Sequence, residues 1–192
     1  MLRRFYYSDL FIDGKEITPY YMPQFILSPG KSKPSPGFPF IYSCNVTDWG
    51  IELHSLPYPK IGHDIAYKDI KYIDLYVVKR VWGMAWTTLI APEFNLDLIV
   101  HTYDHDEEIE IPACFEGKRM CEKIRENGVP VYDRFHIYEQ FPDAQSFQAG
   151  FAQHFLECYP ALAEKYNLDD PRTGFKKSAS LEEIWKAKHK KK

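Results

Sequence analysis

The segment EEIEIPACFEGKRMCEKIREN, Glu107 to Asn127, decides the fold because its hydrophobic period changes partway along. Ile109 and Ile111 alternate with glutamates, which is the period-two pattern of a half-buried strand. After Pro112 the apolar residues instead share one face of a helix. They are Met120, Cys121 and Ile124. Because Asn127-Gly128 is a typical helix stop, the segment predicts a strand that runs into one amphipathic helix.

The region before this helix, from Phe38 to Ile111, has the pattern of consecutive strands rich in β-branched and aromatic residues. The expected strands are Phe40–Val46, Gly50–Leu53, Ile65–Val77, Ala85–Ile90, Leu96–Val100 and Glu108–Ile111. A turn at Thr47-Asp48 precedes the second strand, and the third has an irregularity near Asp69. The connections look too short for helical crossovers, so an antiparallel meander is the simplest arrangement.

Two turn signals lie nearer the N-terminus. Asp13-Gly14, within Tyr7 to Thr18, supplies the positive backbone angles that a two-residue hairpin turn needs. Ser28 to Gly37 concentrates proline, glycine and serine, and proline cannot donate to a sheet ladder. We therefore predict an N-terminal hairpin and then a linker that marks a domain boundary.

Two further helices are predicted after Gly128. Asp143 is a suitable N-cap for the first, which has a kink at Pro160 and apolar residues at a spacing of four. These residues are Phe147, Phe151 and Phe155, and the pattern continues through Leu162 and Tyr166. The second helix begins at Ser180, where Glu183 completes a capping box.

The whole chain is thus predicted to be an α+β protein in three parts. Residues 1–37 form the hairpin and linker. Residues 38–128 form a mostly antiparallel sheet with its closing helix. Residues 129–192 form a helical extension that packs back through its phenylalanines and ends in a basic tail.

Composition limits the classes of partner. The chain has 192 residues, of which 45% are hydrophobic and 16% aromatic, as expected of a folded globular protein. A net charge of −3 provides no global field that would attract nucleic acid or an anionic membrane. The tail Lys186–Lys192 is the local candidate for such contact, although its like charges favour a solvated end.

The cellular setting is also predicted from composition. No run approaches the roughly 18–20 apolar residues that span a bilayer, and the first residues lack the pattern of a signal peptide. We therefore expect a cytoplasmic protein. Its cysteines form no CxxC pair and are predicted to be reduced and buried. They are Cys44, Cys114, Cys121 and Cys158.

The segment HTYDHDEE, His101 to Glu108, is the strongest candidate for chemistry because imidazole and carboxylate groups together can bind a metal. The candidate ligands are His101, Asp104 and His105. Neighbouring strand residues point to opposite faces, however, so only a turn could gather them. Both flanks are strand-like and no zinc signature is present, which favours a polar hairpin turn over a metal or acid/base site.

Other catalytic patterns are weaker. His154 and Cys158 are four residues apart on one helical face, and His136 lies upstream. We interpret them as a partly buried histidine beside a core cysteine. The chain has neither the GxSxG nucleophile motif nor the GxGxxG and P-loop nucleotide motifs, and we expect no cofactor.

The order of strands and closing helix resembles the bacterial pleckstrin-homology-like (PH-like) domains. The residues that carry the resemblance are Asn45–Leu53 (NVTDWGIEL), Ile65–Leu75 (IAYKDIKYIDL) and Glu107–Asn127. It covers about residues 38–127. In that family a strand ends in a Thr-Asp-x-Gly type of turn, and a later strand reads roughly Ile-x-Tyr-x-Asp-Ile.

The resemblance implies a barrel-like sheet plugged at one end by the helix. Members of the wider superfamily are mostly binding modules for proteins, peptides or phosphoinositides. The basic pattern of the phosphoinositide-binding members is missing here, since Leu53–Lys60 offers one lysine. The resemblance therefore implies protein contact ahead of lipid contact.

Aromatic residues are the remaining functional signal. Tyrosine and tryptophan suit interfaces as well as cores, and Trp82 and Trp86 are the predicted contact surface. We expect a non-enzymatic binding module whose partner is another protein or a second copy of the chain. The rivals are a small metal-dependent enzyme that uses the His101–Glu108 segment, and an anionic-lipid or nucleic-acid binder that uses the basic tail.

Overall fold

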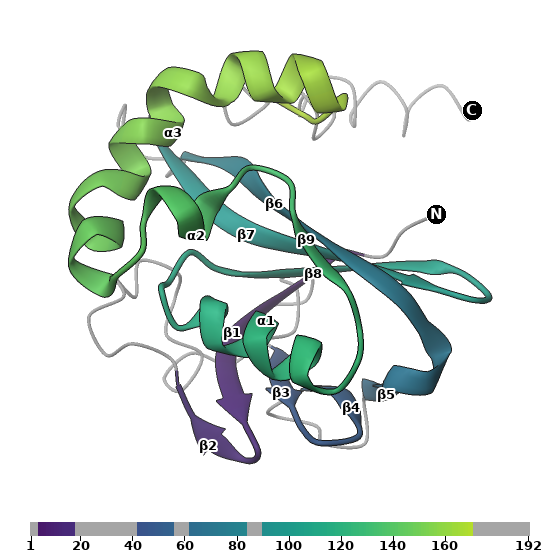
Figure 1. Ribbon diagram of the computed structural model, residues 1–192. Coiled ribbons are helices and arrows are strands. Elements are labelled where there is room, and N and C mark those ends of the chain that lie inside the picture. The colour runs from purple at the N-terminus through teal and green to yellow at the C-terminus, as the bar shows by residue number, and fades with distance from the viewer. Residues whose placement is uncertain (1–3, 18–41, 56–61, 84–89, 171–192) are drawn as a thin grey trace, which may run out of the picture.

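The structure is a computed structural model that describes residues 4–17, 42–55, 62–83 and 90–170 (Figure 1). Its strands are β1 Arg4–Ile12, β2 Lys15–Glu16, β3 Tyr42–Val46, β4 Gly50–Ser55, β5 Gly62–Ala66, β6 Ile70–Gly83, β7 Ile90–Thr102, β8 Asp106–Pro112 and β9 Val131–Asp133. Its helices are α1 Gly117–Glu126, α2 Ile137–Gln140 and α3 Ala144–Tyr166. The α+β class predicted from the sequence is confirmed.

The strands form two mixed sheets that meet in β1. In the first sheet, Arg4–Tyr6 of β1 pair in parallel with β8, and the sheet continues through β7 and β6 to β9. In the second sheet, Tyr7–Ile12 of β1 pair in parallel with β3, and the sheet continues through β4 to β5. β2 pairs with β1 as the second strand of a hairpin. One strand therefore supplies backbone hydrogen bonds to both sheets.

The predicted closed barrel is wrong, and the predicted antiparallel meander holds only within two runs, β3–β4–β5 and β6–β7–β8. Most pairs in the described ranges are antiparallel, as predicted, but β1 pairs in parallel with β3 and β8, and β6 pairs in parallel with β9. In the described part of the chain, β5 and β9 stand at opposite ends of the strand order and do not pair with each other, so the sheets stay open. Periodicity reports which residues face a core, but it does not report which strand is the neighbour.

The strand-to-helix prediction is confirmed. β8 leads into α1, whose Met120, Cys121 and Ile124 are buried, and Gly128 follows with φ 86°. The N-terminal hairpin is also confirmed, because Asp13 and Gly14 have the positive φ angles that its turn requires.

The irregularity predicted near Asp69 is a 3₁₀ turn, Tyr67–Asp69, that divides the expected strand in two. β5 before it pairs with β4, and β6 after it pairs with β7. The turn thus carries the chain from one sheet to the other. The hydroxyl of Tyr67 donates to the carbonyl of Thr47 at 2.8 Å, which fixes the turn against the β3–β4 connection.

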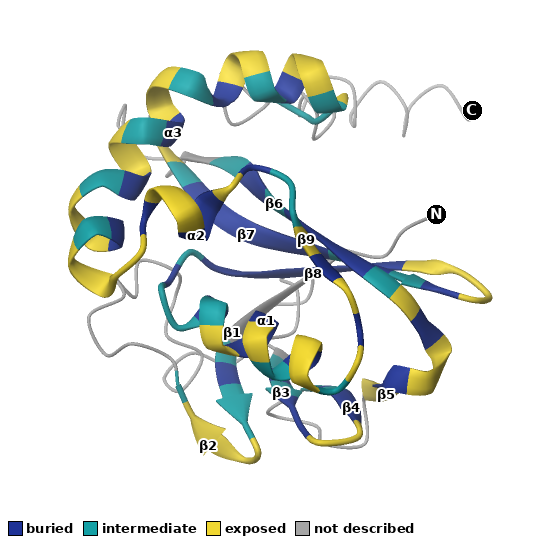
Figure 2. Ribbon diagram, in the orientation of Figure 1, coloured by how far each residue is buried: buried dark blue, intermediate teal, exposed yellow. Residues whose placement is uncertain are grey.

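One apolar core lies between the inner faces of the two sheets and α1, with a layer under α3 (Figure 2). The second sheet contributes Leu10, Cys44, Val46, Ile51, Leu53 and Ile65. The first sheet contributes Ile73, Leu75, Val77, Leu96, Leu98, Val100, Ile109 and Ile111. All of these side chains are at most 6% exposed, so the two sheets share the burial that stabilises them.

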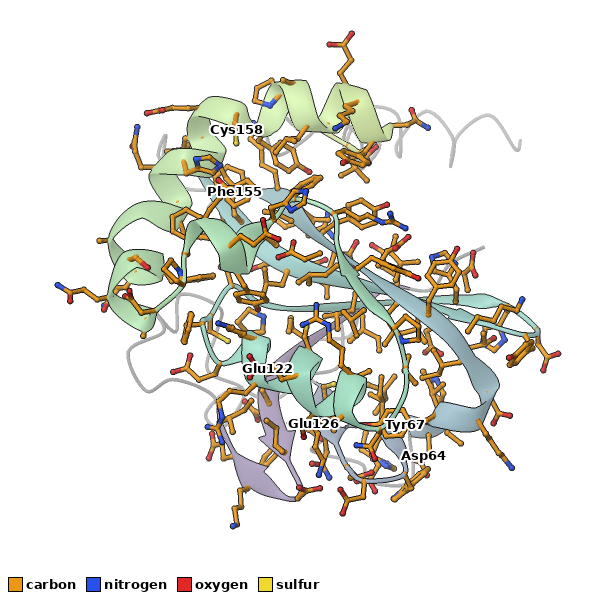
Figure 3. All side chains as sticks on the ribbon, viewed as in Figure 1. Asp64, Tyr67, Glu122, Glu126, Phe155 and Cys158 are labelled. Atoms are coloured by element: carbon orange, nitrogen blue, oxygen red, sulfur yellow. The ribbon has the colours of Figure 1, made fainter. Side chains whose placement is uncertain are left out.

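Helix α3 covers one end of the first sheet through aromatic side chains. Asp143 accepts a hydrogen bond from the backbone N–H of Ser146 at 2.8 Å and completes a capping box, as its sequence position predicts. Phe155 is fully buried and packs against Phe94 of β7 and Phe135 (Figure 3). Pro160 lies inside the helix, whose ribbon bends along its length (Figure 1).

The four cysteines are free, as predicted. Cys44, Cys114 and Cys121 are buried, whereas Cys158 is half-buried and packs against the edge of the core. Burial raises the pKa of the Cys44 thiol to about 12. This thiol therefore stays protonated and packs as a small apolar side chain.

Several predictions lie outside the described residues. They concern the Ser28–Gly37 linker, most of the Ala85–Ile90 strand, the helix from Ser180 and the basic tail. Within the described ranges, no helix combines the length and apolar character needed to cross a membrane.

The α3 packing predicts a contrast between adjacent residues. Phe155→Ala should lower the free energy of unfolding by about 3–5 kcal/mol, because it leaves a cavity among buried rings. The matched control is Leu156→Ala, which truncates a side chain that is 47% exposed and should change stability by less than about 0.5 kcal/mol. Urea unfolding measures both. Equal losses for the two variants would contradict the packing.

Candidate binding surface

The HTYDHDEE segment is a hairpin turn, as predicted. β7 ends at Thr102 and β8 begins at Asp106. The backbone N–H groups of Asp104 and His105 both donate to the Thr102 hydroxyl, at 3.3 and 3.0 Å. Local side-chain acceptors of this kind are typical of tight polar turns.

The three candidate metal ligands of this segment point to different places. His101 lies between Asp74 and Asp106, whereas His105 is exposed and has Glu107 at 3.8 Å. Asp104 is exposed at the tip of the turn. Among the described residues, no three metal-ligating side chains are grouped closely enough to hold an ion.

The strand register explains this separation. His101 is opposite Asp106 and also opposite Tyr72 of β6, so these residues share the outer face of the first sheet. Glu107 is opposite Val100 and therefore belongs to the inner face. In a continuous strand His101 and Asp106 would face opposite sides, but the three-residue turn makes them direct cross-strand partners.

His101 is held on both sides by carboxylates. Its Nδ1 is 2.9 Å from Asp106 Oδ1, and its Nε2 is 3.4 Å from Asp74 Oδ2. The second contact is an ion-pair distance without hydrogen-bond geometry, since Nε2 is buried and none of the described residues makes a hydrogen bond to it. The ring stacks on Tyr72 with centroids 4.3 Å apart. Each ring nitrogen of His101 therefore faces a carboxylate of the protein itself.

Arg134 is the second group fixed by Asp74. Its Nε and Nη2 reach Asp74 Oδ1 at 2.8 and 2.7 Å. The backbone of Arg134 is anchored as well, because its N–H donates to the carbonyl of Leu75 and its carbonyl accepts from the Tyr166 hydroxyl of α3. The guanidinium therefore has a fixed position beside β9.

Tyr132 completes an exposed aromatic surface on β9, the strand beside β6 (Figure 1). Its ring is 47% exposed, with the Arg134 guanidinium carbon 4.9 Å from the ring centroid. Tyr72 meets the same ring edge-on at 5.7 Å. We call Tyr72, His101, Tyr132 and Arg134 the Tyr132 surface, because continuous ring and cation contacts join them.

A buried polar network lies further along the same face of the sheet. Glu110 accepts from Arg80 Nε at 2.9 Å and from Asn95 Nδ2 at 2.8 Å, and a second guanidinium contact comes from Arg80 Nη2. Asp97 and Glu108 are also buried on this face. Burying a carboxylate is costly without partners of the kind that Glu110 has.

The other predicted residues are not gathered into a site. The backbone of Trp82 lies in β6 opposite Ala91, but its side chain and all of Trp86 fall outside the described residues. His154 contacts the rings of Phe141 and Phe155. His136 is exposed beside Glu139, and Cys158 is half-buried on α3.

The Tyr132 surface was missed from the sequence because its members come from β6, β7 and the end of β9, which are far apart along the chain. Asp74 gave a weak signal, since it interrupts the apolar stretch Tyr72–Val78. Tyr132 and Arg134 alternate around Asp133, as residues on one side of a strand do. A three-residue strand is too short for this alternation to stand out.

Comparisons with known proteins add no relative. No protein-family model matches the chain, and neither a curated protein nor a solved structure matches it. The resemblance to PH-like domains therefore stays a prediction. Functional interpretation depends on the chain's own residues.

The Glu110 network predicts that a second substitution restores much of the stability that the first one removes. Arg80→Leu should lower the free energy of unfolding by about 3–5 kcal/mol, because it leaves a buried carboxylate without its cation. Combining it with Glu110→Gln removes that charge and should recover more than half of the loss. Urea unfolding of both single variants and the double variant measures the coupling. A double variant whose loss equals the sum of the single losses would contradict the network.

Proposed function

We propose that this protein is a binding module that contacts a protein partner through the Tyr132 surface. The observation that carries the proposal is the exposed Tyr132 ring packed against an Arg134 side chain that Asp74 holds in place. Tyrosine and arginine are the residue types most often found at the energetic centres of protein interfaces. Their pairing here favours protein contact.

Preorganisation supports the same proposal. Ordering a rotamer-rich side chain on binding costs about 0.5–1.5 kcal/mol, but Arg134 is already ordered by Asp74 and by the packing of its neighbours. Tyr132 is likewise held between Arg134 and Tyr72. A partner would therefore meet a surface that needs little rearrangement.

Protein binding is also the class predicted from the sequence. The proposed contact surface, however, is the Tyr132 surface and not Trp82 and Trp86. A metal-dependent enzyme is disfavoured by the positions of His101 and His105, which face different carboxylates on opposite faces of the sheet. Contact through the basic tail, a PH-like relationship and a cytoplasmic location remain predictions.

The test compares matched surface variants. Tyr132→Ala and Arg134→Ala should each weaken the partner complex about 30-fold or more, as loss of an interface centre does. Arg134→Lys should also weaken it, because an ammonium cannot reproduce the planar contact with the ring. The control is Trp49→Ala, which removes an aromatic ring that is also 47% exposed and lies outside the Tyr132 surface.

Two measurements are needed. Sedimentation of the purified protein tests a second copy as the partner. Affinity enrichment followed by reconstitution with the purified candidate gives Kd for any other protein. Partner complexes that weaken with Trp49→Ala and tolerate Tyr132→Ala would contradict the proposal, provided that thermal unfolding shows each variant to be folded.

A further inference from the structure

Glu107 is a charged residue beside the apolar core, on the inner face of the first sheet. It lies on β8 opposite Val100, which is fully buried, and Glu107 itself is 8% exposed. A carboxylate in this position needs a hydrogen-bonding or charged partner, since burial without one is costly. The Tyr132 surface cannot supply this partner because it lies on the other face of the same sheet.

The partner comes from the other sheet. His63 lies on β5 opposite Leu53, a core residue, so it too is on an inner face. Its Nε2 is 2.6 Å from Glu107 Oε1, the short distance of a charge-assisted hydrogen bond. Because β5 and β8 are separated in the strand order by β4, β3 and β1, this contact joins the two sheets directly at the margin of their shared core.

Other titratable groups surround the pair. His105 in the β7–β8 turn has its Nε2 3.8 Å from Glu107 Oε2. Asp64 follows His63 on β5 and is 3.0 Å from the Nε2 of His54 on β4. Asp64 lies at the β5 end of the molecule near Tyr67 (Figure 3). Most of the charges that face His63 are therefore carboxylates, which favour its protonated form.

We propose that the His63–Glu107 pair is a pH-dependent latch that holds β5 against the first sheet. When His63 is protonated, its ring N–H donates to a buried carboxylate and the latch is closed. When His63 is neutral, the ion pair is lost and β5 is released at its inner side. In the described part of the chain, β5 pairs with β4 alone, so this end strand depends on the latch more than an internal strand would.

The direction of the pH effect follows from the histidine. The hydrogen bond to Glu107 raises the pKa of His63 above its ordinary value, while partial burial opposes this and the charges of Glu107 and Asp64 add to it. A histidine whose pKa is raised on folding stabilises the fold fully below its unfolded pKa, about 6.5. That contribution is lost as the pH rises through the raised value. The latch therefore closes in acid and opens as the pH rises through the raised pKa of His63.

An NMR titration of the histidine side chains tests the latch. The His63 signal is assigned by its loss in His63→Gln. Its pKa should lie above about 6.5 and should fall in Glu107→Gln. A His63 pKa that is the same with and without the Glu107 carboxylate would overturn the proposal.

Hydrogen exchange tests the release of β5 separately. After correction for intrinsic rates, the β5 amides should lose protection relative to the β3 amides as the pH rises through the His63 pKa. His63→Gln should abolish this pH dependence, and His136→Gln should keep it. A pH dependence that persists in His63→Gln would overturn the latch. The Tyr132 surface does not enter this measurement, so its outcome is independent of the proposed function.

Discussion

The structure depends on β1, because this one strand supplies hydrogen bonds to both sheets. Its first residues pair with β8 and its later residues pair with β3, both in parallel. Leu10, in the later part, is fully buried in the shared core. Without β1, no strand pairing among the described residues would join β3, β4 and β5 to β6, β7, β8 and β9. The core would then lose the strand that fixes the inner faces of the two groups against each other.

The first sheet uses strand alternation to keep two polar systems apart. On its outer face, Asp74 orients His101 and Arg134 and so supports the exposed ring of Tyr132. On its inner face, Glu107 reaches His63 in the other sheet. Because neighbouring residues in a strand point to opposite faces, a protonation change at His63 can alter the contact between the sheets without passing through the Tyr132 surface.

Local features could be predicted from the sequence, whereas pairing across the chain could not. The change of period at Pro112 predicted α1, and Asp143 with its phenylalanines predicted α3, since such signals lie within one turn or a few residues. The parallel partners of β1 left no signal, because pairing depends on residues about 35 and 100 positions away. The Tyr132 surface and the His63–Glu107 pair were missed for the same reason: each forms only when distant strands become neighbours. Conversely, the HTYDHDEE segment could be predicted as a hairpin turn because its residues are adjacent in sequence, whereas the contact of His101 with Asp74 depends on strand pairing and could not be predicted.

Native-state hydrogen exchange of β1 tests most directly whether this strand unites the two sheets. The account predicts that the amides of Arg4–Ile12 that donate to β8 and to β3 exchange only through global unfolding, with the same free energy as the central amides of β7. Exchange of the β1 amides at a much lower free energy than those of β7 and β3 would contradict it. That result would mean that the two sheets hold together without β1.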